Sequence, residues 1–468
     1  MNVIPISIPD RREIVLEQTE QTENNPKFRD PERASAAALA YFLSPVHTLP
    51  VELLVDIFNL AVDEWTHIHD ALRISQVCSH WRRIAHGTPR LWTGHIRVCL
   101  ESRSDSRIQT YVDGLKAWLA RSAPFSVPVS FMLGRGDVDH HLLGEVLSAA
   151  PRWRSLDLRM PKDPPLSLVR QLAQCRLDTL EELNLGMNRF ENDITQHDEP
   201  AAISFTNLPR LRKLSICIFS DDASILMPWS QLTDLTLLSD SPDIALGILA
   251  QSSNLTRASV RTMGWSADPG AGRTIVTLDH LRTLSLPFWG WEGPFSRLFD
   301  YLSVPTLEEF RLNALNVLTP DAWSEARFTA FQLRASSITR LNLSYVSLTA
   351  EGLRAAIDHA PLLAQLQLNC CHPCLDDVLL GALTYKGTTG TLAPRLHHLV
   401  LEYMGRNSFT EDILAEMIAS RWWADDAEPV SSTIARWTHV ELVGDFGQHF
   451  MDTMQDLRRK GLDAECRL

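Results

Sequence analysis

A six-residue pattern, apolar-x-x-apolar-x-apolar, recurs eleven times along this chain of 468 residues and constrains its fold more than any other feature. The copies begin at Trp153, Leu180, Leu211, Leu232, Leu255, Leu281, Leu307, Ile338, Leu363, Leu396 and Trp437. Such self-similarity indicates a repeat array, in which each copy buries its apolar face only by stacking on its neighbours. The chain length therefore reflects the number of repeats more than the number of globular domains.

Two further features connect these copies to a known class of repeat. The central residues of successive copies are mostly 21 to 33 residues apart, and Asn188 and Cys371 each stand three residues after the last apolar residue of a copy. The pattern resembles the leucine-rich repeat, which implies an α/β solenoid, or horseshoe, with one strand per copy. The copy at Trp437 follows a longer spacing of 41 residues, which sets it apart from the others.

Other segments extend the predicted array or precede it. Residues 95–98 and 127–133 alternate like strands and predict two degenerate first rungs, with a helix over residues 111–121 between them. Residues 243–251 and 350–359 predict helices on the outer side of the array. We therefore divide the chain into four parts. These are a flexible leader over 1–33, a short helix or linker over 34–47, a helical module over 48–93, and the solenoid with its degenerate capping repeats over 94–468.

The helical module carries apolar residues at helical spacing in two runs, the second of which stops at Gly87-Thr88-Pro89. Its residues Leu49-Pro50-x-Glu52-Leu53-Leu54-x-x-Ile57-Phe58, Val77-Cys78-x-x-Trp81-Arg82-x-Ile84-Ala85 and Pro89-x-Leu91-Trp92 resemble an F-box. The fold class implied is α+β, a three-helix F-box followed by the α/β solenoid. The connection over residues 62–70 is longer than in the family pattern. The alternative is a three-helix bundle whose pattern reflects only its own core.

The whole arrangement is similar to the F-box/leucine-rich-repeat proteins of mushroom-forming fungi. This resemblance implies a non-catalytic substrate-recognition subunit of a Skp-cullin-F-box ubiquitin ligase, which holds an unknown protein substrate on its repeats. The residues expected to dock on a Skp-type adaptor, and through it a cullin, are Leu49, Pro50, Leu53, Leu54, Ile57, Phe58 and Val77. Trp81 and Trp92 are expected to hold the bundle together and join it to the first rung. The alternative function is an interaction scaffold that works without a ligase.

Charge alternates along one face of the predicted array. The residue before each central apolar position is expected on the open side of the sheet, and in chain order these residues are Ser155, Glu182, Lys213, Asp234, Arg257, Thr283, Glu309, Arg340, Gln365, His398 and His439. Because neighbouring strands are about 4.8 Å apart, opposite charges on adjacent rungs are expected to pair laterally. We therefore interpret this ladder as self-satisfied and not as a binding site.

Large aromatic residues gather on two predicted loops at one rim of adjacent repeats. Such side chains are typical anchors of protein interfaces. The candidate substrate-binding residues are Arg261, Trp265, Trp289, Trp291 and Arg311. The alternative is that the aromatic rings cover the edge of the core.

Composition excludes several classes of function. The net charge of −13 argues against a general nucleic-acid binder, because the phosphate backbone requires a basic face. No run of 18 apolar residues and no secretion signal occurs, so we expect no membrane association and an intracellular protein, cytoplasmic or nuclear. The eight cysteines are too irregular for a disulfide framework.

Chemistry-bearing motifs are also missing from the sequence. It contains no phosphate-binding glycine loop, nucleophile elbow or His-Glu-x-x-His zinc motif, and we expect no catalytic residues, cofactor or metal. Cys370-Cys371-His372-Pro373-Cys374 lacks a second Cys/His pair at zinc spacing. Cys374-x-Asp376 resembles the catalytic motif of a bacterial class of ubiquitin ligases, but it lies inside a repeat and not in a separate domain. A catalytic role for Cys374 is the minor alternative.

Overall fold

The computed structural model describes residues 46, 49–63, 67–100, 107–132, 138–159, 166–186, 202–205, 207–219, 224–262, 274–288, 295–315, 323–371, 373–387, 390–403, 409–423 and 434–467. Internal contacts divide the chain into two compact units, Met1–Gly94 and His95–Leu468. The predicted leader over residues 1–33 lies outside the described residues. The predicted helix or linker over 34–47 also lies outside them, except for Val46.

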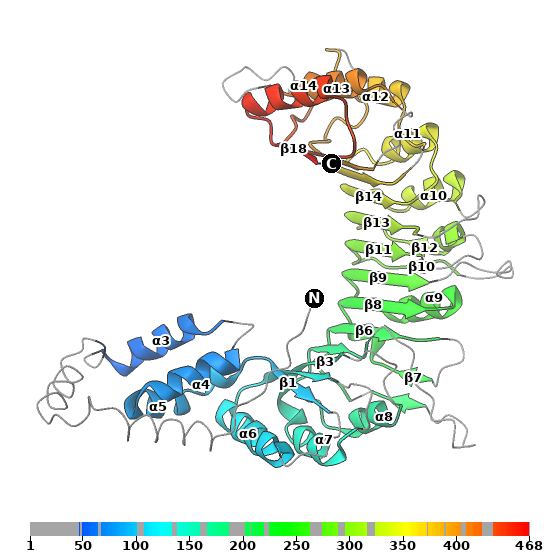
Figure 1. Ribbon diagram of the computed structural model, residues 1–468. Coiled ribbons are helices and arrows are strands. Elements are labelled where there is room, and N and C mark those ends of the chain that lie inside the picture. Colours follow the sequence, from blue (N-terminus) through cyan, green and yellow to red (C-terminus); the bar gives the residue numbers. More distant parts are fainter. Residues whose placement is uncertain are drawn as a thin grey trace, which may run out of the picture. The chain divides into compact units, whose positions relative to one another are not determined.

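The first unit is a small helical bundle, as the sequence predicts. Its elements are α3 (Val51–Ala61), α4 (His67–Val77), α5 (Ser79–His86) and the 3-10 helix η3 (Pro89–Trp92) (Figure 1). Helix α5 begins where the Cys78 side chain accepts a hydrogen bond from the Trp81 backbone N–H. In the core, the ring centroids of Phe58 and Trp81 are 4.8 Å apart, and the buried Trp92 donates from Nε1 to the Ala85 carbonyl at 2.8 Å. The two tryptophans therefore hold the bundle together, as expected.

Helix α4 begins earlier than the apolar pattern indicates. The sequence predicts a connection over residues 62–70, but α4 already begins at His67. The last four residues of the predicted connection therefore belong to α4. The Asp63 backbone N–H donates to Asp70 Oδ2 at 3.3 Å, which fastens the chain leaving α3 to α4. The sequence alone missed this start because His67, His69 and Asp70 are polar and add nothing to the apolar period. Glu64 and Trp65, also in this connection, lie outside the described residues.

The second unit is organised around one sheet of fourteen strands, and every neighbouring pair is parallel. In spatial order the strands are β1 (Ile96–Cys99), β2 (Val127–Met132), β3 (Trp153–Arg159), β4 (Glu182–Asn184), β6 (Lys213–Cys217), β8 (Asp234–Ser239), β9 (Arg257–Thr262), β11 (Thr283–Pro287), β13 (Glu309–Asn313), β14 (Arg340–Ser344), β15 (Gln365–Asn369), β16 (His398–Glu402), β17 (His439–Val443) and β18 (Ala464–Arg467). This spatial order is also the chain order. Two short parallel pairs, β5 (Ile203–Ser204) with β7 (Ile225–Leu226) and β10 (Val276–Thr277) with β12 (Leu302–Ser303), lie outside this sheet.

The strand register follows the six-residue pattern copy by copy. The eleven copies contain the strands from β3 to β17 of the large sheet, and their central residues pair with one another, as Leu156 does with Leu183 and Phe310 with Leu341. The copy set apart by its spacing forms β17, which pairs with β16. Strands β1 and β2 are the two predicted first rungs. The six-residue pattern does not predict β18.

Helices connect many of the rungs. They are α6 (Arg107–Ser122), α7 (His140–Leu147), α8 (Leu166–Gln174), α9 (Pro242–Gln251), α10 (Glu325–Gln332), α11 (Ala350–Asp358), α12 (Asp377–Leu383), α13 (Glu411–Ser420) and α14 (Gln448–Arg459), with 3-10 helices η4 (Ala150–Arg152), η5 (Trp229–Gln231) and η6 (Phe295–Tyr301). In Figure 1, α9 to α14 lie along one face of the sheet. Ser241, Thr349 and Asp376 begin three of these helices, since each side chain accepts a hydrogen bond from a first-turn N–H. The three helices predicted over 111–121, 243–251 and 350–359 correspond to α6, α9 and α11.

The two faces of each strand have different surroundings. The apolar residues of the six-residue copies are buried, whereas the residues flanking the central position are half-buried or exposed, with the exception of Val400. We call the face that carries these flanking residues the open face. The fold is therefore F-box-like helices followed by a leucine-rich-repeat-like array, of mixed α and β structure.

Candidate partner-binding surfaces

Helix α3 exposes an apolar ridge. The side chains of Leu53 and Ile57 are 49% and 43% exposed, and that of Leu60 is 87% exposed. These three residues occupy positions i, i+4 and i+7 and therefore share one side of the helix. Val51 at the start of α3 and Val77 at the end of α4 are also exposed. An apolar ridge at this helical spacing is the form in which one helix enters the hydrophobic groove of a partner.

The structure divides the predicted adaptor-docking residues into two groups. Leu53, Ile57 and Val77 are exposed, as is Pro50, while Leu49 is half-buried. Leu54 and Phe58 are buried in the bundle in this conformation, and their assignment to adaptor docking stays a prediction. Their physical role is to hold α3 against the other helices, with Phe58 packed on Trp81.

The apolar pattern of the sequence does not single out Leu60 as a member of this ridge, nor the exposed Val51 elsewhere on α3. A signal was available, because α3 (VELLVDIFNLA) has more apolar residues than one face of a small bundle can bury. Only Leu54 and Phe58 of this helix are buried. The surplus of apolar residues therefore marked the helix as a docking element.

The charge ladder on the open face is paired, as predicted. Lys213 Nζ lies 2.6 Å from Glu182 Oε1, and Arg257 lies 2.8 Å from Asp234 Oδ1. Arg340 lies 3.3 Å from Glu309 Oε2. The hydrogen bond to Glu182 and the charge of that carboxylate raise the pKa of Lys213. Each of these cations is thus already neutralised within the array.

Because these pairs are exposed to solvent, they contribute little to stability. We expect Lys213→Met to change the free energy of unfolding by less than about 1 kcal/mol, since exposed ion pairs are screened by water and salt. Urea denaturation of the full chain measures this change. A loss of several kcal/mol would contradict the interpretation of the ladder as a solvated surface feature.

The predicted substrate-binding residues are only partly within the described residues. Trp265, Trp289 and Trp291 lie outside them. Arg261 is exposed on β9, and the Nε of the exposed Arg311 donates to Glu309 Oε1 at 2.7 Å. Both arginines therefore lie at the surface, and Arg311 is hydrogen-bonded to a residue of its own strand.

The described residues on either side of Trp289 and Trp291 pack in the core. Phe288 and Phe295, which flank residues 289–294, are buried, and their rings stack with centroids 4.5 Å apart. Phe295 also contacts Trp323, at 6.2 Å between centroids. These two phenylalanines belong to the core and not to a binding surface.

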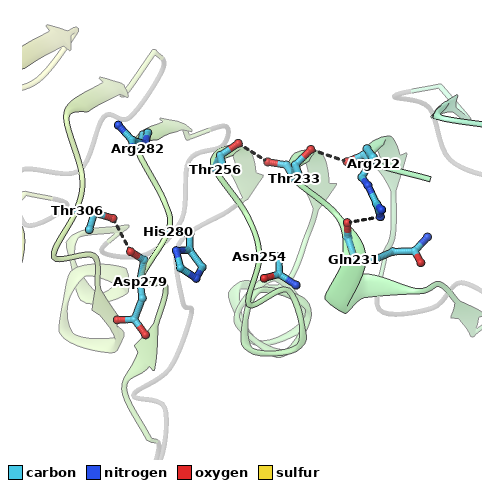
Figure 2. Close-up of a pocket in the computed structure, with 9 residues that line it drawn as sticks. All are labelled: Arg212, Gln231, Thr233, Asn254, Thr256, Asp279, His280, Arg282 and Thr306. Carbon is cyan, nitrogen blue, oxygen red and sulfur yellow. Dashed lines mark hydrogen bonds between the residues drawn. The ribbon is translucent and has the colours of Figure 1, made fainter. Parts of the chain in front are cut away.

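A polar groove of about 600 Å³ lies at the edge of the sheet where β6, β8, β9 and β11 begin (Figure 2). Thr233 Oγ1 donates to the Arg212 carbonyl at 3.3 Å, and Thr256 Oγ1 donates to the Thr233 carbonyl at 3.0 Å. Arg282 pairs with Glu308 at 2.5 Å. These side chains connect one rung to the next. The hydrogen bonds of the groove therefore serve the structure of the array in the first place, and not a ligand.

The thiols of Cys371 and Cys374 are inside the array. Both side chains are fully buried, and Cys371 Sγ donates to the Leu343 carbonyl at 3.3 Å. The hydrogen bond with Cys371, together with burial, raises the pKa of Cys374 far above that of an ordinary thiol. A cysteine nucleophile requires the opposite, a lowered pKa and access to solvent. The geometry therefore opposes a catalytic role for Cys374.

This arrangement predicts a difference in reactivity between two neighbouring thiols. In the folded protein at pH 8, iodoacetamide should label Cys374 at least about tenfold more slowly than the half-exposed Cys370, because only an accessible thiolate reacts. Peptide mass spectrometry separates the two sites. Urea should remove the difference, and rapid labelling of Cys374 in the folded chain would contradict its burial.

Within the described ranges, no three His, Cys, Asp or Glu side chains gather in a group that holds a metal ion. None of the helices in the described part of the chain is both long enough and apolar enough to span a bilayer.

Comparison with known proteins gives one family match. Residues 46–97 match the model of the F-box-like family. No curated protein sequence matches the chain. A leucine-rich-repeat-containing protein, LegL7 from Legionella pneumophila, is 14% identical over 78% of this chain and 97% of its own, with a TM-score of 0.34. TLR13, solved in complex with ssRNA13, is 12% identical over 81% of this chain and 62% of its own, with a TM-score of 0.33.

Proposed function

We propose that this protein, with an F-box-like segment ahead of a leucine-rich-repeat-like array, is the substrate-recognition subunit of a Skp-cullin-F-box ubiquitin ligase. The observation that carries the proposal is the exposed apolar ridge of α3, formed by Leu53, Ile57 and Leu60, inside the segment that matches the F-box-like model. A bundle of this size gains by covering such a surface with a partner. An F-box domain in general implies a Skp-type partner.

In this proposal the two units have separate roles. The F-box, over residues 48–93, docks on the adaptor and through it on a cullin, while the array over residues 94–468 holds a protein substrate. The protein makes and breaks no covalent bond; it raises the effective concentration of substrate lysines near a charged ubiquitin carrier. The sequence-derived contacts Arg261, Trp265, Trp289, Trp291 and Arg311 stay part of this proposal. An intracellular location and a relationship to the F-box/leucine-rich-repeat proteins of mushroom-forming fungi are also part of this proposal.

The test is reconstitution with purified components. The full chain, immobilised through a tag, is incubated with a recombinant Skp-type adaptor and then with adaptor plus cullin. We expect the chain to retain the adaptor alone, and the cullin only when the adaptor is present. A folded chain that retains neither would overturn the ligase proposal and favour the alternative, an interaction scaffold that acts without a ligase.

A further inference from the structure

Three consecutive rungs end in the same unusual backbone conformation. Tyr345, Cys370 and Tyr403 directly follow β14, β15 and β16, and their φ angles are 57°, 50° and 51°. This left-handed region is disfavoured for residues other than glycine by about 1 kcal/mol or more. The array holds them there, since Tyr345 N–H donates to the Asn369 carbonyl at 2.8 Å and Tyr403 N–H donates to the Val443 carbonyl at 2.7 Å. The three residues therefore occupy equivalent, fixed places along one edge of the sheet.

The two tyrosines at this edge are open to solvent. Tyr345 is 40% exposed and Tyr403 is 56% exposed. They are separated by the Cys370 rung, so their backbones are about 10 Å apart, two strand spacings. The electrostatic effect of Cys370 raises the pKa of the Tyr345 hydroxyl most; desolvation, the hydrogen bond with Cys370, and the charges of Glu402 and Tyr403 raise it further. The Cys370 side chain forms a hydrogen bond with that of Tyr345 inside this cluster.

Glu402, the last residue of β16, lies within the same cluster. Its Oε2 accepts from Asn369 Nδ2 at 2.6 Å and its Oε1 accepts from Gln367 Nε2 at 3.3 Å. Asn342 Nδ2 in turn donates to Gln367 Oε1 at 2.7 Å, which orients the Gln367 amide. A chain of neutral amides thus fixes the carboxylate in place.

The partners of Glu402 differ from those of four other carboxylates on the open face, and resemble the neutral Asn184 amide that donates to Asp157 Oδ1 at 2.9 Å. Glu182, Asp234, Glu309 and Glu441 each pair with a Lys or Arg of an adjacent rung or the same strand. Among the described residues, no Lys or Arg lies within ion-pair distance of Glu402. Arg467, which pairs with Glu441 and Glu465, acts on Glu402 only at longer range, so the array orients this carboxylate without giving it a direct ion pair among the described residues.

We propose that Tyr345, Tyr403 and Glu402 form a docking site for the Lys or Arg side chain of a basic segment in a partner protein. Cations are attracted to the faces of tyrosine rings, and a carboxylate supplies the charge-assisted hydrogen bonds. An apolar segment would leave Glu402 unpaired, and an acidic one would be repelled by it and by the net charge of −13. The identification of this partner as the ligase substrate rests on the function proposed above.

Peptide binding to the full chain tests this site. The probe is a fluorescein-labelled peptide of alternating glycine and arginine, and its control has citrulline, the neutral isostere, in place of arginine. We expect fluorescence anisotropy to show binding of the arginine peptide alone. Glu402→Gln should weaken it about tenfold and Tyr403→Ala about fivefold or more, whereas Tyr403→Phe should keep it, because the ring face is retained.

The matched control is Glu182→Gln, which removes an open-face carboxylate already paired with Lys213. This variant should bind the arginine peptide like the native chain. Equal losses in Glu402→Gln and Glu182→Gln would show diffuse attraction to an acidic protein and would overturn the site, as would equal binding of the citrulline peptide. If Glu402→Gln does not fold, the exposed Tyr403 supplies the deciding variant. Adaptor capture is measured in parallel. Its failure would overturn the ligase proposal but would leave the proposal of a cation-binding site unaffected.

Discussion

Replacing Leu53 by Asp is expected to abolish capture of a Skp-type adaptor by the full chain while leaving its thermal unfolding unchanged. Leu53 is half-exposed on the outer side of α3, so the folded bundle loses little buried surface when it is replaced. The complex loses an apolar anchor and gains a carboxylate that must be desolvated. Anchors of this kind are worth about 2 to 4 kcal/mol, so we expect affinity to fall by about 100-fold or more.

The matched control is Asn59→Asp, which adds the same charge on the same helix. Asn59 is also exposed but lies on the polar side of α3, away from Leu53, Ile57 and Leu60. We expect this variant to capture the adaptor like the native chain. A folded Leu53→Asp chain that still binds the adaptor would show that the ridge is not the docking surface. Phe58→Asp cannot answer the question, because it places a charge in the core of the bundle.

The sequence predicts the array well because each rung repeats the same physical requirement. Every copy needs three apolar residues at fixed positions, so one weak copy is supported by ten others. The rung that begins at Trp437 is recovered in this way in spite of its long spacing. Strand β18 was missed because residues 462–466 have apolar residues at every second position, without the six-residue pattern, and only pairing with β17 defines it as a strand.

The candidate sites are less predictable because they depend on which of two similar neighbours is buried. Leu53 and Leu54 are adjacent and chemically identical, yet one is half-exposed and the other is buried. The difference arises from the direction in which α3 packs on α5, which the apolar period alone does not give. A count of apolar residues nevertheless indicates that α3 has an exposed apolar side.

The cluster of Tyr345, Cys370 and Tyr403 illustrates a second limit. These residues are distant in sequence and become neighbours only because each stands two positions after the last apolar residue of its copy. Aligning the copies with one another would have placed them in one column. Their left-handed backbone and the amide hydrogen bonds that orient Glu402 arise from the assembled sheet, so no single copy reveals them.

Truncating Phe310 to Ala is expected to cause the largest loss of stability among simple changes in the array. Phe310, in β13, is the central apolar residue of its six-residue copy and is fully buried. Its ring centroid lies 6.1 Å from that of Phe299, 5.6 Å from that of Phe328 and 5.3 Å from that of Phe331. Removing a buried phenylalanine leaves a cavity and costs about 3 to 5 kcal/mol. The cost should be near the upper value because aromatic rings surround the cavity on several sides and collapse poorly.

Phe310→Leu is the control, because the corresponding residues of the two adjacent copies along the chain are Leu284 and Leu341. Leucine keeps most of the apolar volume, so we expect a loss of about 1 to 2 kcal/mol. Urea denaturation of the full chain measures both variants, and hydrogen exchange locates the change. Since each repeat contacts mainly its neighbours, faster exchange should concentrate in β11, β13, β14 and α10. A Phe310→Ala chain as stable as the native one, or one whose exchange rises equally along the whole array, would mean that the aromatic cluster does not hold these rungs together.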